Sequence, residues 1–253
     1  MSRNLMMAGQ ILLAGIIYYL FFAADHGPFR VETLLDRYYI SRRVSRPVLK
    51  QWAGILILMF FFGAAIQISF STVLTFILSA DEAAASSYDQ AIAPLISMEP
   101  DMVLYVGLLA PVFEELCFRG LAFSFLSWIL LQIVRISDRG RSKLSPDHFL
   151  FFSAWIIANL FQTLFFALYH ENIYQRIYAF VIGYFFGILV LVYRSVVPGM
   201  MAHIFVNLSG FFIDVIFPPD LPKGTKLILM TAGILTVSGI LFKLCRRQSL
   251  RSA

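Results

Sequence analysis

Apolar residues occur along this chain in long, nearly continuous runs, each bounded by a short polar segment. A helix needs about 20 apolar residues to cross a hydrocarbon core of about 30 Å. Runs of that order occur at residues 5–24, 51–79, 102–134, 148–170, 174–193, 196–217 and 226–244. Continuous runs are typical of membrane helices, whereas half-buried strands alternate. The pattern predicts an all-α polytopic membrane helix bundle with about seven transmembrane spans, and eight as the alternative.

The first run resembles the apolar core of a secretory signal. It is long for such a segment, and Phe22-Ala23-Ala24 is a poor small-residue cleavage site. We therefore expect a helix there, which either spans the membrane or lies along its surface. No low-complexity linker and no internal repeat divides the chain. The sequence predicts a single transmembrane domain over residues 1–253.

Composition agrees with a bilayer environment. Hydrophobic residues make up 59% of the chain and charged residues 14%, whereas soluble domains carry about 25% charged residues. The formal net charge is +5, but the basic residues lie in short loops between apolar runs, where membrane topology places them. We therefore expect the lipid bilayer as a partner and no nucleic acid.

Basic residues are distributed unevenly between the predicted loops. Six Lys or Arg lie between residues 30 and 50, none between residues 80 and 101, and four between residues 135 and 143. Cytoplasmic loops retain Lys and Arg. We expect an outside N-terminus, a cytoplasmic C-terminus, and a multi-pass integral membrane protein that lies in the cell membrane if the chain is prokaryotic.

Three ionisable residues occur within the third run. Charges inside a membrane helix are costly, by about 2.5–3.5 kcal/mol each on insertion scales, so they mark functional sites by default. At about 100° per residue, Arg119 lies about 40° around the helix from Glu115 and about 140° from Glu114. The spacing predicts a Glu115–Arg119 ion pair that supports the structure, and it leaves Glu114 as the candidate general base.

Two later runs carry histidines. His170 closes the fourth run, and Asn159 and Thr163 lie on nearly the same helical face upstream of it. In the sixth run, His203 and Asn207 are four residues apart and share a face, as does Asp214. Each residue alone is consistent with packing through interhelical hydrogen bonds. A bundle that needs only packing has no use for all of them, so we expect Glu114, His170, His203 and Asn207 to form one site.

These residue types suit hydrolysis of a peptide bond. Such a reaction needs a base to activate water and donors for the oxyanion that forms on attack. Glu114 and His170 can activate water, while His203 and Asn207 can donate to the oxyanion. The alternative is a catalytic divalent metal such as zinc, held by Glu114, His170 and His203. The HExxH pattern is absent, which favours a mechanism with little or no dependence on metal.

The chain resembles a known family at these residues. The EExxxR, FxxxH and HxxxN motifs of the CAAX prenyl protease and bacteriocin-processing family, CPBP or Abi, are similar to three segments of this chain: Glu114-Glu115 with Arg119, Phe166 with His170, and His203 with Asn207. The similarity covers about residues 105–210. It implies an intramembrane endopeptidase with a catalytic core at about residues 102–217, in which Glu115, Arg119 and Phe166 support the site.

The leading hypothesis is an intramembrane endopeptidase that hydrolyses a peptide bond of a membrane-associated protein or peptide with water activated by Glu114 and His170. The alternative is a non-catalytic immunity or partner-binding membrane protein that retains the family site. A small-solute permease is disfavoured because the spans are not repeated.

Overall fold

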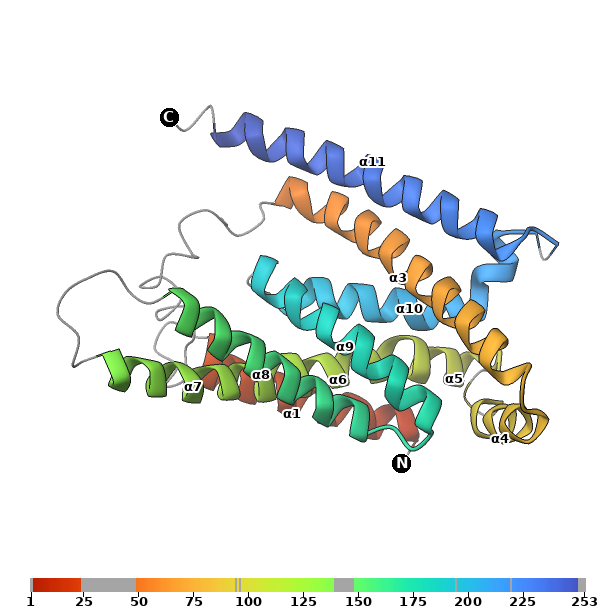
Figure 1. Cartoon of the computed structure of the whole chain (residues 1–253), viewed down its shortest axis with the longest axis horizontal. Helices are drawn as coiled ribbons and strands as arrows, with labels where there is room; N and C mark the ends of the chain where they lie inside the picture. Colours follow the sequence, from red (N-terminus) through yellow and green to blue (C-terminus); the bar gives the residue numbers. More distant parts are fainter. Residues whose placement is uncertain are drawn as a thin grey trace. The chain divides into compact units, whose positions relative to one another are not determined.

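The computed structural model describes residues 2–23, 49–93, 95, 97–138, 148–193, 195–218 and 220–249. Every regular element in these ranges is helical, which confirms the all-α prediction (Figure 1). The elements, with η marking π-helical turns, are α1 (Arg3–Tyr18), η1 (Tyr19–Ala23), α3 (Leu49–Leu78), α4 (Glu82–Ile92), α5 (Pro100–Leu104), η3 (Tyr105–Leu109), α6 (Ala110–Glu115), η4 (Leu116–Ala122), α7 (Phe123–Asp138), α8 (His148–Leu168), α9 (Ile173–Tyr193), α10 (Val197–Ile216) and α11 (Lys223–Ser249).

The chain forms two compact units, and one of the boundaries between them falls within α6. Unit 1 comprises Met1–Arg46 and Val112–Val196, and unit 2 comprises Pro47–Pro111 and Val197–Ala253. Each unit is described by itself below. The expectation of one domain over residues 1–253 stays a prediction.

In unit 1, α8 packs against both α7 and α9, and α1 packs along η4 (Figure 1). Phe123, Trp155 and Ala158 form a buried apolar cluster, in which the Phe123 and Trp155 rings meet edge to face at 5.8 Å. Gly120 lets α1 approach closely, since a Cβ there would lie 3.1 Å from Cδ2 of Tyr18. Small residues at such crossings are typical of membrane helix packing.

In unit 2, α3 packs against α10 and α11 (Figure 1). The α3–α10 crossing is close at Gly63, where a Cβ would lie 2.7 Å from the Ala202 carbonyl oxygen. Ala64 and Ile68 of α3 form a buried cluster with Met230 of α11. The unit is therefore built around α3, whose small residues face its two neighbours.

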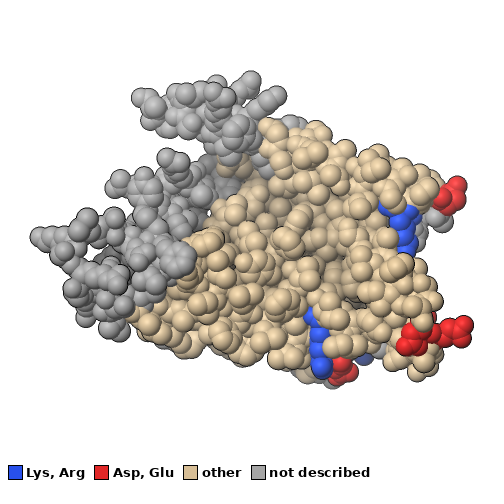
Figure 2. Space-filling model, viewed as in Figure 1, with Lys and Arg blue, Asp and Glu red and all other residues tan. Residues whose placement is uncertain are grey.

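Four helical stretches in the described ranges are long and apolar enough to cross a membrane: Arg3–Phe22, Gln51–Leu78, Pro100–Ile133 and Ile173–Tyr193. Phe152–Leu168 and Val197–Phe212 are apolar but shorter. In the view of Figure 2 the described surface carries few charged side chains. These features identify an integral membrane protein, while the count of seven spans and the cytoplasmic C-terminus stay predictions.

Most predicted boundaries agree with the helices to within a few residues, and two local features differ. The acidic loop between the second and third runs contains a short helix, α4. Asp81 caps its N-terminus, where the Asp81 side chain accepts a hydrogen bond from the Ala84 amide at 3.0 Å. The fourth run was expected to be helical to residue 170, but α8 ends at Leu168. His170 therefore lies in a turn rather than in the helix.

Candidate active site

The predicted pair of Glu115 and Arg119 is confirmed. Arg119 Nη1 donates to Glu115 Oε1 at 2.9 Å, and both side chains are 0% exposed. The guanidinium carbon of Arg119 also lies 4.1 Å from the centroid of the Phe166 ring and 5.4 Å from that of Phe186. The cation is thus neutralised by a carboxylate on its own helix and covered by two aromatic faces.

The helix that carries Arg119 contains a π-helical turn, η4. The Phe123 amide donates to the Phe118 carbonyl, five residues back, where an α-helix would use the carbonyl four residues back. In this winding, residues five apart come closer to one face than the α-helical offset of about 140° suggests. The expectation that Glu114 stands apart from the Glu115–Arg119 pair assumes α geometry, and it stays a prediction.

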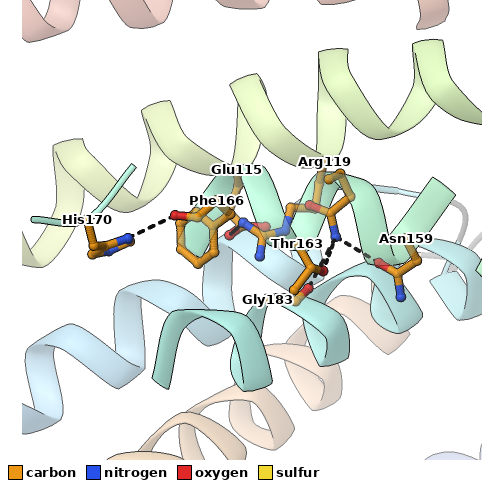
Figure 3. Close-up of polar contacts among 8 residues, drawn as sticks. Glu115, Arg119, Asn159, Thr163, Phe166, His170 and Gly183 are labelled. Atoms are coloured by element: carbon orange, nitrogen blue, oxygen red, sulfur yellow. Dashed lines mark hydrogen bonds and ion pairs between the residues drawn. The ribbon is translucent and has the colours of Figure 1, made fainter. Parts of the chain in front are cut away.

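A buried polar network connects α8 to α9 beside this ion pair (Figure 3). Asn159, Gln162 and Thr163 are all 0% exposed. Gln162 Nε2 donates to Asn159 Oδ1 at 2.7 Å, to Thr163 Oγ1 at 2.8 Å and to the Gly183 carbonyl at 3.4 Å. Asn159 Nδ2 donates to the Tyr184 carbonyl at 3.1 Å. The network therefore fastens one face of α8 to backbone carbonyls of α9.

Two glycines on α9 make room for these side chains. A Cβ at Gly183 would lie 2.8 Å from Arg119 Nη2 and 2.9 Å from Phe166 Cδ1. A Cβ at Gly187 would overlap the Asn159 amide. The sequence singled out Asn159 and Thr163 as a polar stripe but missed Gln162. The signal that could have identified Gln162 is its polar side chain in an otherwise apolar run.

His170 is held in the turn between α8 and α9. Its Nδ1 lies 2.9 Å from the Phe166 carbonyl oxygen, and a carbonyl can only accept, so Nδ1 carries the proton in this contact. In the neutral imidazole, Nε2 then carries the lone pair. The ring is also perpendicular to that of Phe166, with centroids 5.0 Å apart. This tautomer suits a general base or a metal ligand at Nε2.

Glu114 and His170 lie at the same end of two antiparallel helices. Phe118 of η4 meets Phe166 at 5.2 Å and Tyr169 at 5.7 Å, while Phe123 meets Trp155 of α8. Residue 118 therefore contacts the end of α8, whereas residue 123 contacts a position nearer to its start. The two helices run antiparallel. Glu114 precedes Phe118 by about one turn, which places it toward the His170 end of α8.

His203 and Asn207 belong to unit 2, on α10. His203 is 4% exposed. Asn207 Nδ2 donates to the Val106 carbonyl of η3 at 2.8 Å. The approach of α10 to η3 is close there, since a Cβ at Gly107 would lie 2.6 Å from Cδ2 of Leu208. One N–H of the Asn207 amide is thus engaged by the backbone. The side chain of Asp214 lies outside the described residues.

The predicted metal ligands are divided between the units, with Glu114 and His170 in unit 1 and His203 in unit 2. Within neither unit do three described His, Cys, Asp or Glu side chains gather into a group that could hold a metal ion. The tautomer of His170 fits a metal ligand as well as it fits a base. A zinc site therefore stays a prediction.

Part of the chain matches a known protein family. Residues 96–209 match the family model described as Type II CAAX prenyl endopeptidase Rce1-like, an interval that contains all three motifs. No curated protein and no solved structure matches the chain. The match supports a peptidase activity in the membrane with membrane-associated substrates. Over residues 96–209, this integral membrane protein is similar to the type II CAAX prenyl endopeptidase Rce1-like family, as its motifs predicted.

Proposed function

We propose that the chain is an intramembrane endopeptidase that hydrolyses a peptide bond of a membrane-associated protein or peptide with activated water. The arrangement of Glu114 and His170 is the observation that carries the proposal. The two residues lie at one end of a packed helix pair, and His170 Nδ1 is held on the Phe166 carbonyl. A carboxylate and a properly oriented imidazole are what a general-base mechanism needs.

In the proposed reaction, Glu114 and His170 remove a proton from water while its oxygen attacks the carbonyl carbon of the scissile bond. His203 and the second N–H of Asn207 donate to the oxygen that becomes negative. The C–N bond then breaks, and the proton taken from water passes to the leaving nitrogen. Glu115, Arg119 and Phe166 support the site without touching the substrate. If a divalent metal is bound, Glu114, His170 and His203 would hold it, and it would polarise the carbonyl and lower the pKa of water.

The family description suggests the substrate class. A prenylated protein ends in Cys-aliphatic-aliphatic-X with the lipid on the cysteine, and a lipid anchor would bring such a chain end to a membrane-embedded site. We propose a prenylated C-terminal peptide as the first substrate to test, with an unprenylated peptide of the same sequence as the comparison.

The test is cleavage by the full chain reconstituted in lipid vesicles. The probe is a farnesylated peptide with a fluorophore and a quencher on opposite sides of the bond after the cysteine, and mass spectrometry locates the cut. Glu114→Gln keeps the size of the side chain but removes the base, so we expect cleavage to fall by at least about a hundredfold. Glu82→Gln, at an exposed residue of α4, is the matched control.

Unchanged thermal unfolding of Glu114→Gln would show that the variant is folded. Equal cleavage by the folded Glu114→Gln protein and the wild type would overturn the proposal. Binding of the peptide without any cleavage by the wild type would favour a non-catalytic partner-binding protein.

A further inference from the structure

His170 does not belong to a helix, so its orientation depends on contacts of the turn formed by residues 169–172. The His170 amide donates to the Ala167 carbonyl at 3.1 Å. The imidazole Nδ1 meets the Phe166 carbonyl at 2.9 Å. These two contacts hold the residue from the α8 side.

A third contact comes from α9. Arg176 Nε donates to the His170 carbonyl at 2.7 Å. Hydrogen bonds from a guanidinium are charge-assisted and roughly twice as strong as neutral ones. The side chain of Arg176 is half-buried, which limits competition from water. This hydrogen bond of Arg176 connects α9 to the backbone of His170.

Arg176 is itself firmly placed in the first turn of α9. Its amide donates to the Asn172 carbonyl at 2.9 Å. Asn172 caps the helix through its side chain, with Oδ1 accepting from the Tyr174 amide at 2.9 Å and from the Gln175 amide at 3.4 Å. The N-cap thus fixes the start of α9. The hydrogen bond from Arg176 then couples the His170 carbonyl to this fixed helix start.

The two backbone contacts of His170 act on different peptide units, on either side of its Cα. Holding both the amide and the carbonyl restrains φ and ψ and so sets the direction of the Cα–Cβ bond. The contact of Nδ1 with the Phe166 carbonyl then sets the ring.

We propose that Arg176 is a positioning residue for His170: its guanidinium fixes the His170 carbonyl and thereby aims Nε2 at the reacting water. This inference rests on the proposed function for its catalytic consequence. The structural part, that Arg176 orders the turn at residues 169–172, does not depend on that function.

The catalytic test compares Arg176→Met, which keeps the apolar stem and removes the donors, with Arg176→Lys, which keeps a charged donor. With the farnesylated peptide, we expect kcat of Arg176→Met to fall by about tenfold or more, because small errors in placing a catalytic group are costly. We expect KM to change by less than about twofold, since Arg176 does not touch the substrate. Arg176→Lys should recover most of kcat.

Lys223→Met is the matched control. Lys223 Nζ donates to Thr75 Oγ1 at 3.1 Å in unit 2, so the variant also removes a cation that bonds to a neighbouring helix. Its kcat should equal that of the wild type. Equal kcat values for Arg176→Met and the wild type would overturn the proposal, as would an Arg176→Lys enzyme as impaired as Arg176→Met.

Hydrogen exchange followed by mass spectrometry tests the turn without any substrate. In Arg176→Met, the amides of Tyr169 and His170 should exchange faster, while peptides from α3 and α10 should exchange as in the wild type. Unchanged exchange in the turn would overturn the inference even if the enzyme were active. Faster exchange in a chain that cleaves no probe would uphold the ordering role of Arg176 and reject the proposed function instead.

Discussion

Phe166 joins Arg119 to His170. The guanidinium carbon of Arg119 lies 4.1 Å from the centroid of the Phe166 ring, and the carbonyl of Phe166 meets Nδ1 of His170 at 2.9 Å (Figure 3). The ring of this one residue thus packs on the buried ion pair while its backbone orients the candidate base. A change in the ion pair can therefore affect His170 through Phe166.

Replacement of Phe166 should cost both stability and activity. Phe166 is 0% exposed, whereas its neighbour Phe165 is 50% exposed. We expect Phe166→Ala to lower the free energy of unfolding by about 3 kcal/mol, because it leaves a cavity beside Arg119. Phe165→Ala should cost less than about 1 kcal/mol. Reversible unfolding in mixed detergent micelles measures both, and similar costs for the two variants would contradict the prediction.

The ion pair should show strong coupling in a double-mutant cycle. Arg119→Met leaves the Glu115 carboxylate buried without its cation, which we expect to lower the free energy of unfolding by about 3–5 kcal/mol. Glu115→Gln combined with Arg119→Met removes both charges, so the double variant should be more stable than Arg119→Met alone. Strictly additive costs would show that the pair contributes no interaction energy of its own.

Gly183 should tolerate no side chain. A Cβ there would lie within 3 Å of Arg119 Nη2 and Phe166 Cδ1, so Gly183→Ala should destabilise the protein by about 1–3 kcal/mol through overpacking. Gly9→Ala is the control, because a Cβ at Gly9 meets nothing within 4 Å. There the alanine should be neutral or stabilising by up to about 1 kcal/mol. Thermal unfolding of both variants distinguishes overpacking from a general effect of alanine.

We expect peptide cleavage to persist in the presence of a chelator such as 1,10-phenanthroline, since the chain lacks the HExxH pattern of zinc peptidases. The measurement compares initial rates before and after chelation. Loss of activity that added zinc restores would instead assign Glu114, His170 and His203 as metal ligands. In that case His170→Ala should also lower the zinc content measured by atomic absorption.

Interactions within one helix could be predicted from the sequence. Glu115 and Arg119 are four residues apart, and this spacing brings side chains together in any helix that contains it. The positions of the helices could be predicted for a similar reason, because uninterrupted apolar runs have few other ways to satisfy their backbone groups in a membrane. The linked motifs likewise predicted the family to which residues 96–209 are similar.

Local departures from regular helix could not be predicted. The π-helical turn η4 and the end of α8 at Leu168 result from packing, because the residues at both places are compatible with a continuous α-helix. The first feature contains Arg119 of the buried ion pair, and the second moves His170 into a turn. Both alter the candidate site without any signal in the apolar pattern.

The sequence by itself determined a membrane-embedded helical protein, the Glu115–Arg119 pair and the residue types available for hydrolysis, because these depend on composition and on the period of a helix. Only the tertiary structure decided that Gln162 links Asn159 to Gly183, that Phe166 covers Arg119 and that Arg176 holds His170. Those contacts join residues on different elements, and their formation depends on which helix faces meet and how closely the glycines let them approach.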